Sequence, residues 1–356
     1  MRGLGLVMIR KLDNPPNPFR RQHVEYLTDV PEAKVEVYEE QARSILSHND
    51  SPDLPFDWSV NPYRGCQHAC AYCYARPYHE YLDLGAGTDF DTKLFVKVNA
   101  PELLRRALSA PKWRGEPIEF SGVTDCYQPL EAVYEVTRKC LQVCLDFRNP
   151  AAIITRGYLI VRDAALLAAL HREAGLSVMI SIAFADDATA RLLEPHAPPP
   201  SRRFEAIRRL REAGVPVGVM LAPIIPGLND RDIPRILEQA AECGAQTASC
   251  TALRLPGSVE SVFLSRLRDV MPLQAGRIES RIREIRGGKL NETRPGKRMT
   301  GEGPYWEAIM QQFRIHRVRH GLGRPSFPRA IDPRRVRRSG QQLSLSFDRK
   351  EEDAGG

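Results

Sequence analysis

A short segment with three closely spaced cysteines constrains this chain more than any other feature. Cys66, Cys70 and Cys73 stand in a CxxxCxxC spacing, and the next cysteine along the chain is Cys126. A structural zinc site and a plain electron-transfer cluster each take four protein ligands. Three thiolates on one loop can instead bind three irons of a [4Fe-4S] cluster. The spacing therefore predicts a cluster whose fourth iron is open to another ligand.

A zinc knuckle is the alternative interpretation of the same cysteines. His68 or His79 would then supply the fourth ligand, since histidine is a common zinc ligand. The aromatic Tyr72 directly before the third cysteine favours the cluster, because a zinc loop does not require it.

Length and composition indicate a protein with a substantial core. The 356 residues are 42% hydrophobic, enough for one large α/β domain or two smaller ones. The eight cysteines do not form a short secreted framework, and no apolar run approaches the length of a membrane span. We therefore expect a cytoplasmic monomer with reduced thiols and no membrane contact.

Positive charge is concentrated near the C-terminal end. The chain has 51 lysines and arginines against 44 acidic residues, and between Arg314 and Arg338 nine arginines face one acid, Asp332. Such a segment is typical of a solvated, mobile end, and it also suits attraction to nucleic-acid phosphates. Both interpretations stay open.

A repeated helix-then-strand pattern predicts the architecture. Gly175, Gly214 and Gly244 each follow a helical segment and precede an apolar strand. A glycine at this place tolerates the positive φ of a helix C-terminal cap. The expected strands after these glycines are 177–182, 215–221 and 246–252, preceded along the chain by 118–121 and 151–155. Alternating helices and strands predict a parallel sheet.

The rest of the chain divides around this series. We expect an N-terminal arm over 1–50 with a short helix or turn at 39–46, a core domain over 51–258, a helical appendage over 259–322 and a disordered basic tail over 323–356. Within the core, residues 57–64 and 93–98 are expected as strands, and 74–83 as a helix leaving the cysteine loop.

The wider frame around the cysteines, NPYRGCxHxCxYCYARPxHEY, resembles the spore photoproduct lyase-like branch of the radical S-adenosylmethionine (SAM) enzymes. The resemblance covers roughly residues 10 to 325. It continues through five further segments, Ser51-Pro52-Asp53 with Phe56-Asp57, Thr124-Asp125-Cys126-Tyr127-Gln128-Pro129-Leu130-Glu131, Arg162-Asp163, Pro223-Ile224-Ile225-Pro226-Gly227 and Leu253-Arg254-Leu255-Pro256. It implies a partial (β/α)6 TIM-like barrel with its chemistry at the carboxyl ends of the strands.

The resemblance also implies the reaction class. In such enzymes the amino and carboxylate groups of SAM bind the open iron of the [4Fe-4S] cluster. One electron from a flavodoxin- or ferredoxin-type donor then cleaves SAM to methionine and a 5′-deoxyadenosyl radical. The cofactor performs this chemistry, and the protein positions it and excludes water. The family's mechanism makes Cys66, Cys70 and Cys73 the cluster ligands.

Candidate SAM contacts follow the expected strands. The family contacts the methionine amino group where Ser121, Gly122, Thr124 and Asp125 stand here, although no Gly-Gly-Glu motif is present. Thr155 and Arg156 are candidates for the carboxylate or the substrate, Ser181 for the ribose hydroxyls, and Ile224, Ile225 and Tyr72 for the adenine. The alternative is that polar residues at strand ends merely satisfy backbone groups.

The other cysteines carry weaker expectations. Cys126 follows a strand end, where a thiol could return a hydrogen atom to a product radical. The alternative is a small buried apolar residue, as free cysteines often are. Cys140 and Cys144 share a helical face, but no further ligand pair accompanies them, which argues against an auxiliary cluster.

The end of the chain suggests a partner. Gln342-Leu343-Ser344-Leu345-Ser346-Phe347 resembles the peptides by which bacterial repair proteins bind the DNA sliding clamp. With the basic segment before it, this favours a nucleic-acid substrate and lesion repair-like chemistry. The alternatives are the same chemistry on a protein or small molecule, and a non-catalytic metal-binding nucleic-acid module.

Overall fold

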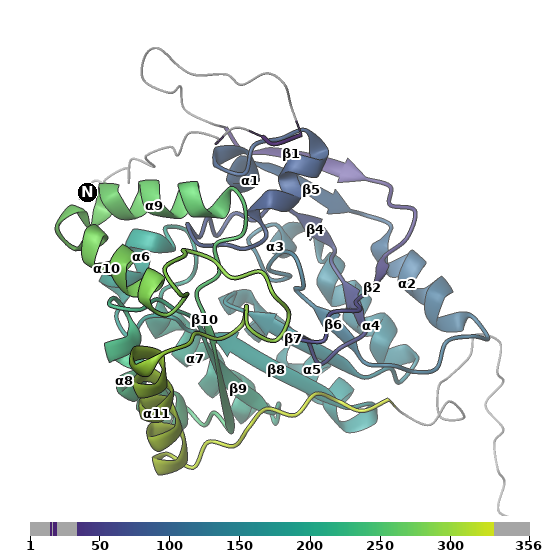
Figure 1. The fold of residues 1–356 in the computed structure, drawn as a ribbon. Coiled ribbons are helices and arrows are strands. Elements are labelled where there is room, and N and C mark those ends of the chain that lie inside the picture. Colours follow the sequence, from purple (N-terminus) through teal and green to yellow (C-terminus); the bar gives the residue numbers. More distant parts are fainter. Residues whose placement is uncertain (1–14, 16, 20–33, 331–356) are drawn as a thin grey trace, which may run out of the picture.

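A seven-stranded sheet forms the centre of the protein (Figure 1). The computed structural model describes residues 15, 17–19 and 34–330. Six neighbouring strands of the sheet are parallel, namely β3 (Trp58–Val60), β6 (Ile118–Phe120), β7 (Ala151–Thr155), β8 (Leu176–Ser181), β9 (Val217–Ile224) and β10 (Thr247–Ala252). β2 (Leu46–His48) pairs antiparallel with β3 at one edge. The expected partial barrel of six parallel strands is confirmed.

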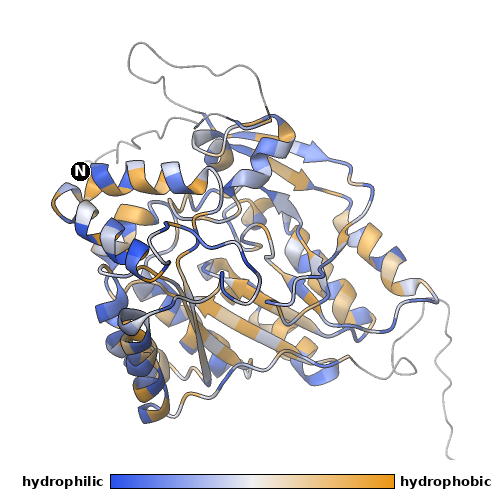
Figure 2. Cartoon of the chain, in the orientation of Figure 1, coloured by the Kyte–Doolittle hydropathy of each residue, from blue (hydrophilic) through white to orange (hydrophobic). Residues whose placement is uncertain are grey.

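Helices connect the parallel strands and cover the outer face of the sheet (Figure 1). The longer connecting helices are α2 (Ala100–Ser109), α4 (Val136–Asp146), α5 (Ala164–Glu173), α7 (Pro200–Glu212) and α8 (Ile233–Glu242). The shorter ones are α1 (Thr88–Thr92), α3 (Glu131–Tyr134), α6 (Asp187–Leu193), η2 (Tyr158–Asp163) and η3 (Asp230–Asp232). Figure 2 shows largely hydrophobic strands surrounded by helices that carry hydrophilic residues, as expected of a buried parallel sheet.

Alternation along the strands separates two faces. Ile118 and Phe120 of β6 lie in the main hydrophobic core with residues of the outer helices, and so do Ile153, Val178 and Val219 of the next three strands. Because successive side chains of a strand point to opposite faces, the residues between them face the interior of the barrel.

The glycine caps occur where the sequence predicts them. Gly175 precedes β8 with a φ of 97°, and Gly214 precedes β9 with a φ of 80°. In this left-handed region an L side chain would be strained, so glycine lets each helix end and the chain turn back into the sheet.

A second, three-stranded sheet corrects several expectations. Its order is β1 (Glu36–Glu40), β5 (Lys93–Lys97) and β4 (Tyr63–Arg64). The helix or turn expected at 39–46 was wrong, because β1 pairs in parallel with β5 and β2 follows. The strand expected at 57–64 is divided into β3 and β4, which belong to different sheets.

The helix after the cysteine loop also differs from expectation. The segment η1 (Arg76–Leu82) is a 3-10 helix and not an α-helix. It ends at Asp83, whose φ of 61° turns the chain away.

The C-terminal helices pack against both parts of the core. α9 (Val259–Val270) and α10 (Pro272–Glu284) contribute to a second hydrophobic cluster that includes Cys70 and Tyr72. α11 (Pro304–Arg319) places Trp306, Ile309 and Phe313 in the main core. The domain boundaries expected from the sequence stay predictions.

The segment after α11 is described as far as residue 330. Gly323 pairs with Thr247 beside β10, and Phe327 stacks against Phe56. Residues 331–356 lie outside the described part, including most of the tail expected to be disordered and the expected clamp-binding peptide. Within the described residues, no helix has the length and apolarity needed to cross a membrane.

Candidate active site

The cysteine loop begins at a turn that only glycine accommodates. Gly65 has a φ of 74°, and a Cβ there would lie 2.8 Å from Leu94 Cδ2 and 2.9 Å from the Phe90 carbonyl oxygen. The next amide, that of Cys66, donates to the same Phe90 oxygen at 3.0 Å. Contacts with α1 and with β5 of the small sheet thereby fix where the first cysteine enters the site.

Gln128 joins the loop to the segment after β6. Its Nε2 donates to the Gly65 carbonyl at 3.0 Å, and its Oε1 accepts from the Gln67 amide at 3.1 Å. The side chain is fully buried. These contacts give Gln128 a structural place against the cysteine loop.

Arg76 holds the other end of the loop. Its guanidinium donates to the Cys70 carbonyl from Nε at 3.0 Å and to the Ala86 and Gly87 carbonyls from Nη1 at 2.9 Å. It also pairs with Asp91 at 2.9 Å and has no exposed surface. A buried guanidinium with all these partners keeps the loop in one conformation.

The three cysteine thiols lie close enough to affect one another. Cys66 and Cys70 are buried and Cys73 is half-buried. Burial raises the pKa of all three, and the charges of Cys73 and Cys70 raise that of Cys66 further. The pKa of Cys70 is raised to about 12, although nearby Arg156 lowers it. Cationic irons would offset this cost and bind the thiolate forms.

Neither histidine of the loop is placed as a zinc ligand. His79 makes a 2.8 Å hydrogen bond to the Lys93 carbonyl through Nε2, and His68 faces Asp125 at 3.5 Å. Among the described residues, no three His, Cys, Asp or Glu side chains form a group that could hold a single metal ion. A [4Fe-4S] cluster does not require the three thiols to converge on a single ion, because each thiolate binds its own iron.

Asp125 collects hydrogen bonds from two neighbouring strand ends. It accepts from the Arg156 amide and from the Tyr127 amide, each at 2.9 Å, and from the Thr155 hydroxyl. Burial raises its pKa, but the charge of His68 and these hydrogen bonds outweigh burial and hold the pKa well below its usual range. Asp125 therefore remains an anion that fixes the backbone at Arg156.

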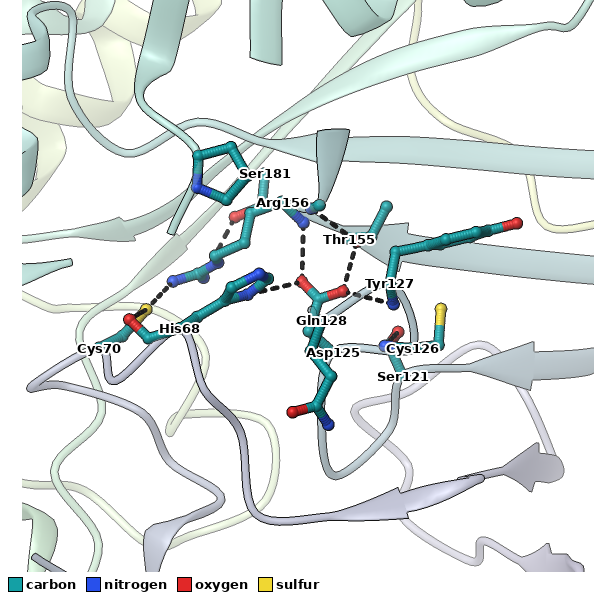
Figure 3. Close-up of polar contacts among 12 residues, drawn as sticks. His68, Cys70, Ser121, Asp125, Cys126, Tyr127, Gln128, Thr155, Arg156 and Ser181 are labelled. Atoms are coloured by element: carbon teal, nitrogen blue, oxygen red, sulfur yellow. Dashed lines mark hydrogen bonds and ion pairs between the residues drawn. The ribbon is translucent and has the colours of Figure 1, made fainter. Parts of the chain in front are cut away.

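Arg156 lies between the cysteine loop and the next strand end, as Figure 3 shows. Its Nη1 is 2.6 Å from Cys70 Sγ, and its Nη2 is 3.5 Å from Ser181 Oγ. Ser181 in turn donates to the Ala222 carbonyl at 3.1 Å. The sequence predicted these strand-end residues separately, and the structure brings them together around one cysteine.

Glu194 is a site residue that sequence analysis missed. It is completely buried, accepts hydrogen bonds from Tyr72 and Arg203, and lies 3.5 Å from Arg156. Burial raises its pKa, but the two arginines outweigh burial and lower it. Its position after α6 gave no signal, because the partners are far apart in sequence. Arg203 of α7 could have indicated a buried acidic partner, because it is the arginine of that helix that lies on the buried face.

Three further predicted residues lie around the turn after β6. Ser121 has a φ of 84°, and its hydroxyl accepts from the Cys126 amide at 2.9 Å. The Gly122 carbonyl accepts from the Tyr74 hydroxyl at 2.9 Å, and the Thr124 hydroxyl donates to the Tyr63 carbonyl at 3.2 Å. Their hydrogen bonds shape the turn beside the cysteine loop, and their SAM contacts stay predictions.

The apolar candidates are divided between two clusters. Ile225 lies with Tyr72 in the cluster formed by the C-terminal helices, whereas Ile224 belongs to the main core. Cys126 is also in the main core, and its sulfur points away from Cys70 (Figure 3). That position favours the alternative of a small buried apolar residue over a hydrogen-atom donor.

The fold and the cysteine loop can now be compared with known proteins. The model of the radical SAM superfamily matches residues 60–240. The chain belongs to the radical SAM superfamily. Membership makes it a radical SAM enzyme, and the superfamily implies both SAM and a [4Fe-4S] cluster. The chain is 38% identical over 234 residues to an uncharacterized protein of Mycobacterium tuberculosis, covering 65% of this chain and 68% of that protein.

Other relatives of this radical SAM enzyme are more distant. An uncharacterized protein of Methanocaldococcus jannaschii is 29% identical over 198 residues, which cover 56% of this chain and 71% of that protein. A protein of Pseudomonas phage M6 named radical SAM Nalpha-GlyT isomerase is 25% identical over 188 residues, which cover 52% of this chain and 37% of that protein.

Spore photoproduct lyases share the fold. The structure of that lyase complexed with dinucleoside spore photoproduct matches with a TM-score of 0.58 and 14% identity, over 81% of each chain. A lyase variant with bound AdoMet and the same dinucleoside matches with a TM-score of 0.56 and 15% identity, over 82% of this chain and 81% of that one. The likeness to the lyase-like branch is thus confirmed for the fold.

Proposed function

We propose that this radical SAM enzyme binds its [4Fe-4S] cluster through Cys66, Cys70 and Cys73 and acts on a nucleic acid. The observation that carries the proposal is the loop itself. Two buried thiols and one half-buried thiol stand on one short segment near the carboxyl ends of the parallel strands, with the Arg156 guanidinium 2.6 Å from one sulfur. When bound, the cluster and SAM supply a 5′-deoxyadenosyl radical, with one electron from a flavodoxin- or ferredoxin-type donor.

The residues of the chain fit this role by positioning and charge. Arg156 offers a cation beside the loop, where the carboxylate of SAM would bind it. Asp125 and Thr155 fix the backbone from which Arg156 extends, and Glu194 fixes its guanidinium. Ser181 lies within reach of the same guanidinium and is the candidate for the ribose. Tyr72 and Ile225 give an apolar side that suits adenine.

A nucleic-acid substrate has independent support. The chain carries a net charge of +7, and a cationic protein is attracted to phosphates. A spore photoproduct lyase with the same fold is described in complex with a dinucleoside spore photoproduct. A base damaged or modified within a strand would have to leave the stack to reach the barrel.

An anaerobic assay tests the proposal. The protein is reconstituted with iron and sulfide, reduced with dithionite and given SAM, with and without DNA or RNA. We expect 5′-deoxyadenosine, formed faster when the correct nucleic acid is present. The Cys66→Ala, Cys70→Ala and Cys73→Ala variants should form none, whereas the Cys243→Ala variant, altered at the end of α8, should match the wild type. An iron-loaded wild type that forms no 5′-deoxyadenosine contradicts the proposal.

A further inference from the structure

The inner face of the barrel is lined mostly by small side chains. By strand alternation, the inward positions of the six parallel strands include Ser59, Ser177, Ser181, Gly218, Ser249 and Thr251. Met220 and Ser249 on this face are partly exposed, whereas the outward Val219 and Ala248 beside them are fully buried. Bulky residues usually fill the interior of a closed barrel. The inward serines fill less space than bulky side chains would, although Met179 and Thr247 occupy the space over Gly218.

Glu119 is the one ionisable residue among these inward strand positions. It stands at the middle of β6, in register with Ser59 of β3 and Ala152 of β7. Only 2% of it is exposed, and its Oε1 has no hydrogen-bond partner. No cation among the described residues forms an ion pair with it. Burying a carboxyl oxygen without a partner is costly, so such an atom is uncommon unless a ligand completes it.

The chemistry of Glu119 limits what that ligand can be. Burial raises the pKa of the carboxyl group well above its usual value, although a hydrogen bond from the backbone of Ile154 opposes this. Burial therefore favours the protonated group, which offers one O–H donor and one carbonyl acceptor side by side. This pair complements an edge with a carbonyl beside an N–H, as in an amide or the imide of a thymine base.

Tyr74 contacts the turn that follows the strand of Glu119. Its hydroxyl donates to the Gly122 carbonyl in that turn at 2.9 Å. The Arg254 guanidinium, which follows β10, lies 5.6 Å from the Tyr74 ring centroid. The buried Nε of Arg254 has no hydrogen-bond partner, and Arg254 pairs with no carboxylate of the described residues. Tyr74 itself is 42% exposed.

Tyr74 thus contacts both the turn after the strand of Glu119 and the Arg254 side chain. An exposed aromatic ring can stack on a base, and a cation without a carboxylate partner can bind a phosphate. The protonated carboxyl group can form hydrogen bonds to an amide-like edge. We propose that Glu119 recognises the hydrogen-bonding edge of a nucleobase held in the barrel, with Tyr74 against the base and Arg254 towards the backbone phosphate. This specificity role rests on the proposed function, and it identifies the part of a nucleic acid that enters the site.

Binding experiments with the full-length reconstituted protein and SAM test this role without requiring turnover. The probes are a short single-stranded oligothymidylate, the same oligonucleotide methylated at thymine N3, and an abasic strand of equal length. For the wild type we expect the methylated probe to bind about tenfold more weakly, the effect of one well-placed pair of hydrogen bonds. The abasic strand should bind more weakly still, because it also loses the contact of the base with Tyr74. Equal affinity for the unmethylated and methylated probes overturns the proposal.

Variants assign the effect to Glu119. The Glu119→Leu variant should bind the unmethylated and methylated probes equally, at the affinity that the wild type has for the methylated probe. The Glu119→Gln variant keeps a donor and an acceptor and should retain most of the discrimination. The Glu102→Gln variant, which changes an exposed acid on α2, should match the wild type. Discrimination that persists unchanged in Glu119→Leu, with the variant folded by circular dichroism, overturns the proposal.

Further measurements test the phosphate contact, the class of ligand and the proposed function separately. Arg254→Gln should weaken binding of every probe alike and reduce the slope of log affinity against log salt by about one, as loss of a phosphate contact does. A neutral peptide that binds through Glu119 while no oligonucleotide discriminates would overturn the nucleobase assignment. If the wild type forms no 5′-deoxyadenosine but still discriminates between the probes, the proposed function fails and the base-recognition role stands.

Discussion

Arg156 Nη1 lies 2.6 Å from Cys70 Sγ, although the two residues come from different strand ends. The contact places a permanently charged guanidinium on the loop that we propose as the cluster site. Glu194 and Ser181 lie on either side of that guanidinium, each 3.5 Å away. A cation fixed in this way is suited to receive a carboxylate, and its planar geometry allows two parallel hydrogen bonds.

Replacing Arg156 tests that assignment. In Arg156→Gln we expect SAM to bind about tenfold or more weakly, since a lost charge-assisted hydrogen bond costs about 1.5–3 kcal/mol. Arg156→Lys should recover part of the affinity through charge but not the two-point geometry. Calorimetric titration of the reconstituted protein with SAM measures both. Unchanged affinity in Arg156→Gln, beside an unchanged control at the exposed Arg106→Gln, would contradict the assignment.

Gln128 should matter for holding the cysteine loop. Gln128→Ala leaves the Gly65 carbonyl and the Gln67 amide without their partner, and we expect a loss of about 1–3 kcal/mol in the free energy of unfolding. The iron content after reconstitution should fall as well, because the loop becomes less ordered. Gln142→Ala, in which an exposed glutamine on α4 is removed, is the matched control. Equal iron content and stability in both variants would show that Gln128 does not support the loop.

Asp125 makes the stability of the fold depend on acid. Its pKa in the folded protein lies below the value of 3.8 that applies when it is unfolded, so its contribution is present above about pH 4 and is lost as the pH falls towards the folded value. Asp125→Asn should therefore be less stable at neutral pH by about 2 kcal/mol. The difference from the wild type should shrink on acidification. Urea unfolding of the metal-free protein from pH 3 to 7 measures it, and a difference independent of pH would contradict this assignment.

Glu194 should be costly to remove. Glu194→Ala leaves the buried Arg203 without its carboxylate, and we expect a loss of about 3–5 kcal/mol, the usual cost of breaking a buried pair from one side. Thermal unfolding of the metal-free protein gives the effect. Glu212→Ala, at the exposed end of α7, should change stability by less than about 0.5 kcal/mol. A similarly small effect for Glu194→Ala would rule out a supporting role.

The barrel could be predicted from the sequence because the residues that indicate it lie within each helix-and-strand unit. Helix-capping glycines such as Gly175 and Gly214 mark each return to the sheet, and the carboxyl ends of parallel strands must meet at one edge. Thr155 and Ser181 were each recognised as polar strand ends, and the pairing of β7 with β8 places them at neighbouring strand ends.

Other features depend on contacts between distant segments. The division of 57–64 into two strands follows from Asn61 and Pro62, since Asn61 accepts from the Val123 amide and proline cannot donate to a ladder. The strand β1 depends on its pairing with β5, because its own side chains are almost all exposed and form no buried face that could be recognised in the sequence. Glu194 meets Tyr72 across the fold, and no local spacing could reveal that contact.

The central claim is that three cysteines leave one iron open for SAM. Electron paramagnetic resonance of the reconstituted, dithionite-reduced protein, recorded before and after adding SAM, tests it most directly. We predict a [4Fe-4S]⁺ signal that changes when SAM binds and disappears in the Cys70→Ala variant. A signal that stays the same with saturating SAM, or an iron-free protein that holds zinc at the three cysteines, would contradict the account.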